Sequence, residues 1–206
     1  MPSKKDVTIR KDVRAALLFI SFRLFLYQGF ADVSINDIVQ QAGLTKGGFY
    51  HYFKSKDDLV EAVFERYIAS YFNNILDIPG EDPHERLRAI CGRLNGAAAY
   101  LKEVFGEESS NPRQFCLLMT EGIKRYPFIR DFRLSFLSRI RLLIAQVLEE
   151  GKRQGLVRPT ANADDLALTL LAYSEGMPLL HLIDNEIEIE RAVGSSFDQL
   201  WAAITA

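Results

Sequence analysis

The chain has 206 residues, of which 48% are hydrophobic and 25% are charged, and its net charge is −2. This composition is typical of a soluble globular protein with enough apolar residues to fill a core, and it is unlike that of a low-complexity chain. The length allows one large domain or two small ones.

The charge is distributed unevenly along the chain. Residues 1–60 hold nine Lys/Arg and six acids, a balance of +3, whereas the remainder carries −5. A basic N-terminal part on an acidic remainder fits a small DNA-binding domain joined to something else. A chance asymmetry of a few charges is the alternative.

Cellular location follows from three features. Cys91 and Cys116 have no paired spacing and no histidine nearby, as in a reduced protein. No apolar run approaches about 18 residues, and the N-terminus lacks the apolar core of a signal peptide. We therefore expect a cytoplasmic protein that does not contact a membrane.

Residues 1–9 are predicted to form a short, flexible polar tail, either solvated or placing Lys4 and Lys5 near phosphates. A helix should follow from about residue 10 to residue 28, where Gly29 stops it. Its apolar face, which includes Leu17 and Leu24, is wide, so the next elements must cover it.

The stretch 34–53 predicts two short helices joined by a tight turn. Ser34 can cap the first helix, with Asp37 three residues later as the acid of a capping box. Gly43 tolerates the left-handed conformation that ends a helix, and Thr45 can cap the second one. A helix, a short turn with glycine and a second helix form a helix-turn-helix, whose second helix enters the DNA major groove.

The second helix offers an outward surface suited to DNA. Phe49 and Phe53 can face inward and anchor it, while lysines neutralise phosphates and a tyrosine donates a hydrogen bond to one. The two glycines are poor helix formers, and their missing Cβ atoms allow close approach to DNA. The candidate DNA-binding residues are Ser34, Thr45, Lys46, Gly47, Gly48, Tyr50, His51, Lys54 and Lys56.

This stretch resembles the DNA-binding domain of the TetR (tetracycline repressor) family of bacterial regulators. At Gly48 the family often carries alanine or a small hydroxyl residue, so a direct DNA contact there is in doubt. The resemblance implies a divergent helical body that binds an effector and dimerises. The matching residues are Phe22, Gly29, Phe30, Ser34, Asp37, Ile38, Ala42, Gly43, Leu44, Thr45, Lys46, Gly47, the run Phe49–Phe53, and Lys54 to Leu59.

A helix at 56–76, ended by Pro79 and Gly80, carries two neighbouring apolar stripes. That breadth exceeds one surface-helix face, so the helix should pack against two bodies and link them. Beyond it the periodicity is helical throughout, with helices near 83–105, 112–125, 127–154, 162–183 and 187–205. The breaks between them lie at residues 106–112, 126–127, 155–159 and 184–185.

The predicted fold is all-α. An N-terminal three-helix DNA-binding domain with the helix-turn-helix spans residues 10–55. A larger helical effector-binding and dimerisation domain spans residues 56–206, and helix 56–76 links the two.

No catalytic or metal-binding constellation stands out, so we expect neither an enzyme nor a bound metal or cofactor. The histidines His51, His84 and His181 lie in different predicted helices, and no Gly-rich phosphate loop or catalytic motif occurs. His51 suits a DNA contact, with a plain surface residue as the alternative. His181 suits a core or interface position.

The body contains apolar side chains for a ligand cavity between helices. Each of them could equally be plain core. Glu175 and Arg139 or Arg141 are candidate polar handles, with a solvated or salt-bridged role as the simpler interpretation. The candidate effector-binding residues are Phe105, Phe115, Met119, Phe132, Phe136, Tyr173 and Met177, with Phe128 as a further candidate.

The last two helices carry more apolar surface than one chain can cover, which predicts a dimer. The resemblance implies a four-helix interface with two helices from each subunit. The candidate interface residues are Leu166, Leu170, Leu180, Phe197, Leu200 and Trp201.

These expectations combine into a homodimeric transcriptional repressor that a small, largely apolar effector releases from a palindromic operator in double-stranded DNA. Two alternatives stay open. One is a sequence-specific DNA-binding protein without an effector, acting as an activator or controlled by a protein partner. The other is a helical enzyme or lipid carrier that no longer binds DNA.

Overall fold

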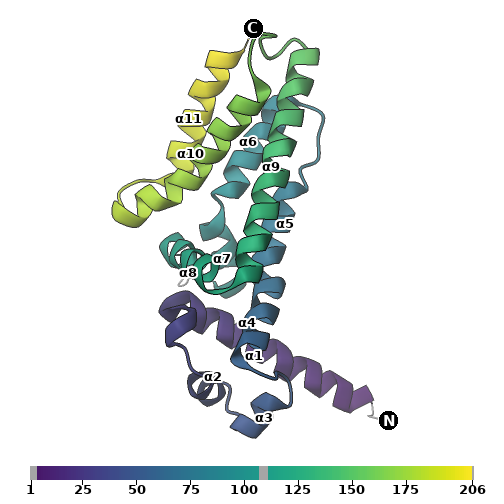
Figure 1. Ribbon diagram of the computed structural model, residues 1–206, viewed down its shortest axis with the longest axis vertical. Coiled ribbons are helices and arrows are strands. Elements are labelled where there is room, and N and C mark those ends of the chain that lie inside the picture. Colours follow the sequence, from purple (N-terminus) through teal and green to yellow (C-terminus); the bar gives the residue numbers. More distant parts are fainter. Residues whose placement is uncertain (1–3, 107–110, 206) are drawn as a thin grey trace. The chain divides into compact units, whose positions relative to one another are not determined.

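The computed structural model describes residues 4–106 and 111–205, and the chain is helical in these ranges (Figure 1). Val157 and Thr205 form one isolated antiparallel bridge, and no strand forms within the described ranges. The all-α prediction is confirmed. The elements are α1 Lys4–Asp32, α2 Ile35–Gln41, α3 Lys46–Tyr50, α4 Lys56–Val63, the π-helical segment η1 Phe64–Ala69, α5 Ser70–Leu76, α6 Pro83–Leu94, α7 Ala97–Phe105, α8 Pro112–Arg125, α9 Pro127–Arg153, α10 Ala163–Ile183 and α11 Ile189–Ile204.

The chain divides into two compact units. Unit 1 consists of Met1–Ser70 and Leu117–Ile129, and unit 2 consists of Tyr71–Cys116 and Arg130–Ala206. This division differs from the predicted boundary at residues 55 and 56 in two respects. The linking helix belongs to unit 1 as far as Ser70, and the corner between α8 and α9 belongs to unit 1 as well.

Unit 1 is built on α1, against which α2 and α4 pack, while α3 packs on α2. Helix α1 begins at Lys4, so residues 4–9 of the predicted tail are helical, and residues 1–3 lie outside the described residues. Gly29 has φ 84 and ψ 166 and kinks the end of α1, a conformation that is essentially restricted to glycine. Phe22, Phe25 and Phe30 are fully buried in the core of this unit.

The predicted linking helix 56–76 has a π-helical segment in its middle. Segment η1 spans Phe64–Ala69, and the Ser70 hydroxyl donates to the Glu65 carbonyl at 3.2 Å. The division between the units follows η1 directly. π-Helical turns inside an α-helix occur often at functional sites. Segment η1 is therefore a candidate position for a change in the conformation of this helix.

Unit 2 contains the long helix α9 and the helices α6, α10 and α11 (Figure 1). Helix α6 packs against both α10 and α11. The predicted helix 83–105 is interrupted: α6 ends at Leu94, Asn95 and Gly96 form a turn, and α7 begins at Ala97. The predicted break at residues 106–112 includes residues 107–110, which lie outside the described residues.

Two helical stretches are long and apolar enough to cross a membrane when only length and composition are considered: Asp12–Asp32 and Ala163–Ile183. The core helix of a globular protein passes the same test. Asp12–Asp32 supplies the fully buried Leu17, Phe22 and Phe25 to the core of unit 1. The packing of α1 therefore explains its apolar composition without a membrane.

Candidate DNA-binding surface and effector cavity

The first helix of the motif, α2, begins with a complete capping box. The Ser34 hydroxyl donates to Asp37 Oδ2 at 2.6 Å, the Ser34 N–H donates to the same oxygen at 2.8 Å, and the Asp37 N–H donates to Ser34 Oγ. The hydroxyl and N–H of Ser34 lower the pKa of the Asp37 carboxyl. Ser34 is exposed, and its hydroxyl orders the entry to the motif.

Helix α3 has a buried side and an exposed side. Thr45 Oγ1 accepts from the Gly48 N–H at 3.1 Å and starts the helix. Phe49 and Phe53 are buried, with ring centroids 5.8 Å apart, and they anchor the helix as predicted. The predicted DNA-binding residues Thr45, Lys46, Gly47, Tyr50, His51 and Lys54 are exposed, and Gly48 is half-buried.

The two glycines of α3 are not required by packing inside the chain. A Cβ atom at Gly47 would lie 3.8 Å from Thr45 Oγ1, and one at Gly48 would lie 3.6 Å from the same atom. Both distances are ordinary van der Waals contacts. The missing side chains therefore leave space on the outer surface, where a DNA backbone can approach closely.

Lys56 has a different position from the one predicted. Its ammonium donates to the carbonyls of Phe30 and Ala31, at the kink that ends α1. Burial lowers the pKa of Lys56 below its ordinary value, and the nearby charge of Arg125 acts in the same direction. The structure thus corrects the prediction: Lys56 stabilises the kink of α1 instead of facing a phosphate.

The same kink is held from α8 by Glu121. The N–H groups of Phe30 and Ala31 donate to the two carboxylate oxygens of Glu121 at 2.8 and 2.7 Å. These are charge-assisted hydrogen bonds, which are about twice as strong as neutral ones. The Tyr126 ring meets the Phe30 ring edge-on, with centroids 5.4 Å apart. We name this set of contacts the Glu121 clamp, and sequence reasoning missed it.

The glycine at position 122 leaves little space for a side chain in the same packing. A Cβ atom there would lie 3.0 Å from Ile129 Cδ1 and 3.2 Å from Phe30 Cε2. Helix α8 therefore approaches the end of α1 as closely as a glycine allows. The α8–α9 corner is a packed part of the DNA-binding unit.

Several predicted effector residues form an aromatic cluster in unit 2. Phe72 lies at its centre, with the rings of Phe115, Phe132 and Phe136 at centroid distances of 6.2, 6.1 and 4.9 Å. Phe115 and Phe136 are buried, as expected of core side chains. This arrangement agrees with the plain-core alternative for these three residues.

The other predicted effector residues are scattered. Met119 is buried in unit 1, and Met177 is buried in α10 of unit 2. Phe105 is half-buried at the end of α7. Tyr173 donates its hydroxyl to the Ala192 carbonyl at 2.9 Å and lines a cavity of about 140 Å³ together with Cys91. The predicted set is therefore not one site.

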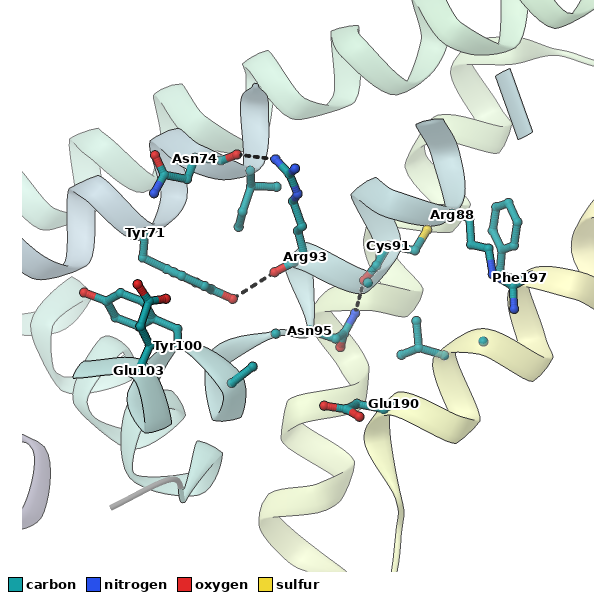
Figure 2. Close-up of a pocket in the computed structure, with 16 residues that line it drawn as sticks. Tyr71, Asn74, Arg88, Cys91, Arg93, Asn95, Tyr100, Glu103, Glu190 and Phe197 are labelled. Carbon is teal, nitrogen blue, oxygen red and sulfur yellow. Dashed lines mark hydrogen bonds between the residues drawn. The ribbon is translucent and has the colours of Figure 1, made fainter. Parts of the chain in front are cut away.

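A larger cavity of about 590 Å³ lies in unit 2 (Figure 2). Its size is within the range of small-molecule sites. Burial raises the pKa of the Cys91 thiol in its wall to about 11, so this thiol stays protonated. The cavity is lined by Tyr71, Asn74 and Ile75 of α5, Arg88, Cys91, Gly92 and Arg93 of α6, Asn95 and Gly96, Ala99, Tyr100 and Glu103 of α7, and Glu190, Val193, Gly194 and Phe197 of α11.

One sequence signal could have pointed to this cavity. Asn95 and Gly96 form an Asn-Gly pair in the middle of the predicted helix 83–105, and such pairs mark turns. The turn separates α6 from α7, and both residues line the cavity. The helical periodicity of residues 83–105 conceals this turn, because apolar residues continue on both sides of it.

The candidate polar handle Glu175 forms an ion pair, as the simpler interpretation had it. Glu175 Oε2 accepts from the Arg133 guanidinium at 2.7 Å, and that guanidinium lies 4.6 Å from the centroid of Phe72. The partner of Glu175 in this ion pair is thus Arg133. The two other candidate handles, Arg139 and Arg141, are exposed. The pair is part of the internal structure of unit 2.

The predicted dimer residues fall into three groups by exposure. Leu170 and Phe197 are 2% and 3% exposed, so their own chain already covers them, and the structure corrects their assignment to the interface. Leu166, Leu200 and Trp201 are half-buried. Leu180 is 51% exposed, and it is joined on α10 by exposed apolar neighbours: Leu168, Leu179 and Ile183.

Comparison with known proteins supports the resemblance. Residues 20–63 match the family model for bacterial regulatory proteins of the tetR family. The HTH-type transcriptional regulator EthR of Mycolicibacterium smegmatis is 25% identical over 179 residues, which cover 85% of this chain and 77% of EthR. The HTH-type transcriptional repressor NemR of Escherichia coli K12 is 34% identical over 105 residues, which cover 51% of this chain and 46% of NemR.

Solved structures share the fold along the whole chain. A TetR transcriptional regulator from Chloroflexus aurantiacus matches with a TM-score of 0.72 at 22% identity, over 95% of this chain and 96% of that chain. A protein from Saccharomonospora viridis, solved in complex with choline, matches with a TM-score of 0.73 at 22% identity, over 95% and 99%. From the helix-turn-helix geometry, the family model over this motif and the shared fold, we conclude that the chain carries a DNA-binding domain of the TetR family, has the fold of TetR regulators and is a DNA-binding transcriptional regulator.

Proposed function

We propose that this regulator is a cytoplasmic homodimeric repressor, and that a small, largely apolar effector releases it from a palindromic operator. The observation that carries the proposal is α3, whose outward residues are exposed while Phe49 fixes its inward side. A short helix on a rigid core is the form in which side chains enter the major groove.

The cavity in unit 2 supports an effector. A filled body would favour control by a protein partner, whereas a space of about 590 Å³ suits a small molecule. A protein of the same fold binds choline in its crystal structure, which supports a small-molecule effector in this fold. The effector-responsive repressor is therefore favoured over the alternative without an effector.

The exposed face of α10 supports the dimer. Leu168, Leu179 and Ile183 recur at helical spacing and are 53%, 51% and 85% exposed. A second copy of the chain would cover this face and place two α3 helices on one DNA duplex. Two-fold symmetry then requires a palindromic operator, with half-sites about one helical turn, or a multiple of it, apart.

Release requires that the effector prefer the state that does not bind the operator. Three helical stretches pass from one unit to the other, at Ser70, Leu117 and Ile129. Within unit 1, α4 continues into the first of these, and the Glu121 clamp holds the second, α8, at the end of α1. We propose that these stretches carry the effector's influence to α3.

A pair of duplexes tests the dimer and the operator symmetry together. One carries two half-sites in inverted repeat, and the other carries one intact half-site and one scrambled half-site. The protein should bind the symmetric duplex as a dimer and with far higher affinity. Equal affinity for both duplexes, with one chain bound to each, would contradict the proposal.

Lys54→Ala is expected to weaken binding to every DNA sequence alike and to lower the salt slope by about 1 per subunit, because one phosphate contact is lost. Fluorescence anisotropy over a series of salt concentrations measures both effects. The matched control is Lys56→Met, whose ammonium lies on the carbonyls of α1. This control should lower stability and leave the salt slope unchanged, and an unchanged slope in Lys54→Ala would remove Lys54 from the DNA contacts.

His51→Ala is expected to change which operator is preferred. His51 is exposed at the end of α3, and its ring packs edge-on against Tyr52, with centroids 5.2 Å apart. A ring held in this way can meet a base edge, where a single lost contact costs about 1–3 kcal/mol of discrimination. Competition between operators that differ at single base pairs measures the preference. Unchanged affinity and preference would show that His51 does not read DNA.

A further inference from the structure

The chemistry of the 590 Å³ cavity narrows the class of effector. Three aromatic side chains, Tyr71, Tyr100 and Phe197, lie in its wall. The rings of Tyr71 and Tyr100 are tilted by 34° with centroids 4.9 Å apart, and Tyr71 and Phe197 are 8% and 3% exposed. An apolar ligand body can bury itself on this surface.

The donor groups of Arg88, Arg93 and Tyr71 in the wall are engaged by the protein. The Arg88 guanidinium pairs with Asp198, and the Arg93 guanidinium donates to the carbonyls of Asn74 and Asp77. The Tyr71 hydroxyl donates to the Arg93 carbonyl at 2.9 Å. The dashed lines in Figure 2 follow the contacts of Arg93 and Tyr71 with their neighbours in the wall.

One hydrogen-bond acceptor in the wall, Asn95 Oδ1, has no partner among the described residues of the protein. Asn95 is 5% exposed and donates its amide to the Cys91 carbonyl at 3.0 Å, which leaves its buried Oδ1 without a hydrogen bond. A buried carbonyl oxygen without a donor is costly, and in native structures it usually indicates a missing partner. Asn95 therefore points to a ligand that donates a hydrogen bond.

Two carboxylates on exposed residues lie in the same wall, where their formal charge balances that of the guanidinium groups of Arg88 and Arg93. Glu103 of α7 and Glu190 of α11 form no ion pair among the residues that the structure describes. Figure 2 shows Glu103 on the side of Tyr71 and Tyr100, and Glu190 on the side of Phe197. The cavity thus offers unpaired oxygen acceptors beside aromatic faces.

From these contacts we propose that the cavity binds an organic ammonium ion with an apolar body. The ammonium N–H groups donate to Asn95 Oδ1 and to one of the two carboxylates, Glu103 or Glu190, which lie on different sides of the cavity (Figure 2). The body packs on Tyr71, Tyr100 and Phe197, whose ring faces also attract a cation. This assignment rests on the proposed function only for its regulatory consequence, because binding itself requires no DNA.

The test is isothermal titration of the full-length protein with a matched series of ligands. Phenethylammonium and hexylammonium supply the cation on two different bodies, 2-phenylethanol is the neutral analogue, and 3-phenylpropionate is the anionic one. Both cations should bind about tenfold or more tightly than the alcohol, and the anion should bind least. Trp201 gives a second readout, since its ring stacks on Phe197 and it is the single tryptophan.

Variants locate the site. At least one of Glu103→Gln and Glu190→Gln should weaken phenethylammonium by about tenfold, the value of one charge-assisted hydrogen bond, and both should leave 2-phenylethanol unchanged. Glu186→Gln removes an exposed acid of the α10–α11 turn that does not line the cavity, and it should change nothing.

The inference is overturned if neither ammonium ion binds the folded protein, if the alcohol binds as tightly as the cations, or if both lining variants bind phenethylammonium like the unmodified protein. Each of these results can coexist with operator binding measured on the same sample. They would reject the ammonium class without rejecting the regulator.

Discussion

Glu121→Ala is expected to lower the free energy of unfolding by about 2–3 kcal/mol, because two charge-assisted hydrogen bonds to the α1 kink are lost. The Phe30 N–H, part of a buried residue, would then lack its acceptor. Urea unfolding followed by circular dichroism measures the loss. The variant is also expected to lose coupling, so that an effector still binds to it and releases the operator less completely.

Two further variants serve as controls for this result. Glu121→Gln keeps one oxygen that can accept from one N–H group, so its effect on stability should be intermediate. Lys124→Ala changes an exposed neighbour on the same helix and should leave both stability and release unchanged. If Glu121→Ala unfolded and released DNA like the unmodified protein, the clamp would have neither role.

Glu175→Ala is expected to destabilise unit 2 by about 2 kcal/mol. The Arg133 side chain is 11% exposed, so removing its acid leaves a largely buried positive charge against the Phe72 ring. Breaking a buried pair on one side costs about 3–5 kcal/mol, and the 40% exposure of Glu175 lowers the value expected here. Trp201 fluorescence during urea unfolding reports on unit 2 directly, because the single tryptophan lies there.

The double variant Arg133→Met, Glu175→Gln separates charge from shape. It removes both charges and keeps side chains of similar length, so much of the lost stability should return. If the double variant were as unstable as Glu175→Ala or more so, the pair would be stabilising through packing and not through charge.

The helix-turn-helix could be predicted because its signals are short-range. Ser34 and Asp37 form their capping box within one turn, Thr45 caps α3 three residues before Gly48, and Phe49 and Phe53 lie one turn apart. Local hydrogen bonds and helical spacing decide these contacts. The all-α fold followed from the same periodicity over longer stretches.

The Glu121 clamp could not be predicted in this way. Glu121 and the Phe30 N–H are separated by 91 positions along the chain, and no local pattern marks a glutamate that binds a distant kink. Lys56 illustrates the same limit, since it lies beside Lys54 in the sequence. Only tertiary packing shows that the Lys56 ammonium lies on α1.

The apolar body presents a related ambiguity. Periodicity identifies Leu170, Phe197 and Phe136 as apolar face residues, but it does not say whether the neighbour is the same chain, a second copy or a ligand. Helix α10 is apolar around most of its circumference, so Leu170 is buried while Leu180, ten residues later, is exposed. Tertiary packing determines which neighbour covers each apolar face. The spacing of apolar residues in one sequence does not show this.

The most direct test of the account is selection from a pool of random DNA duplexes by the purified, effector-free protein at physiological salt. The account predicts enrichment of one palindrome, bound by two chains, and loss of that enrichment in a variant with Lys46, Tyr50 and Lys54 replaced by alanine. Retention of DNA without sequence preference, or enrichment that survives this replacement, would contradict the assignment of α3 as the DNA-reading helix.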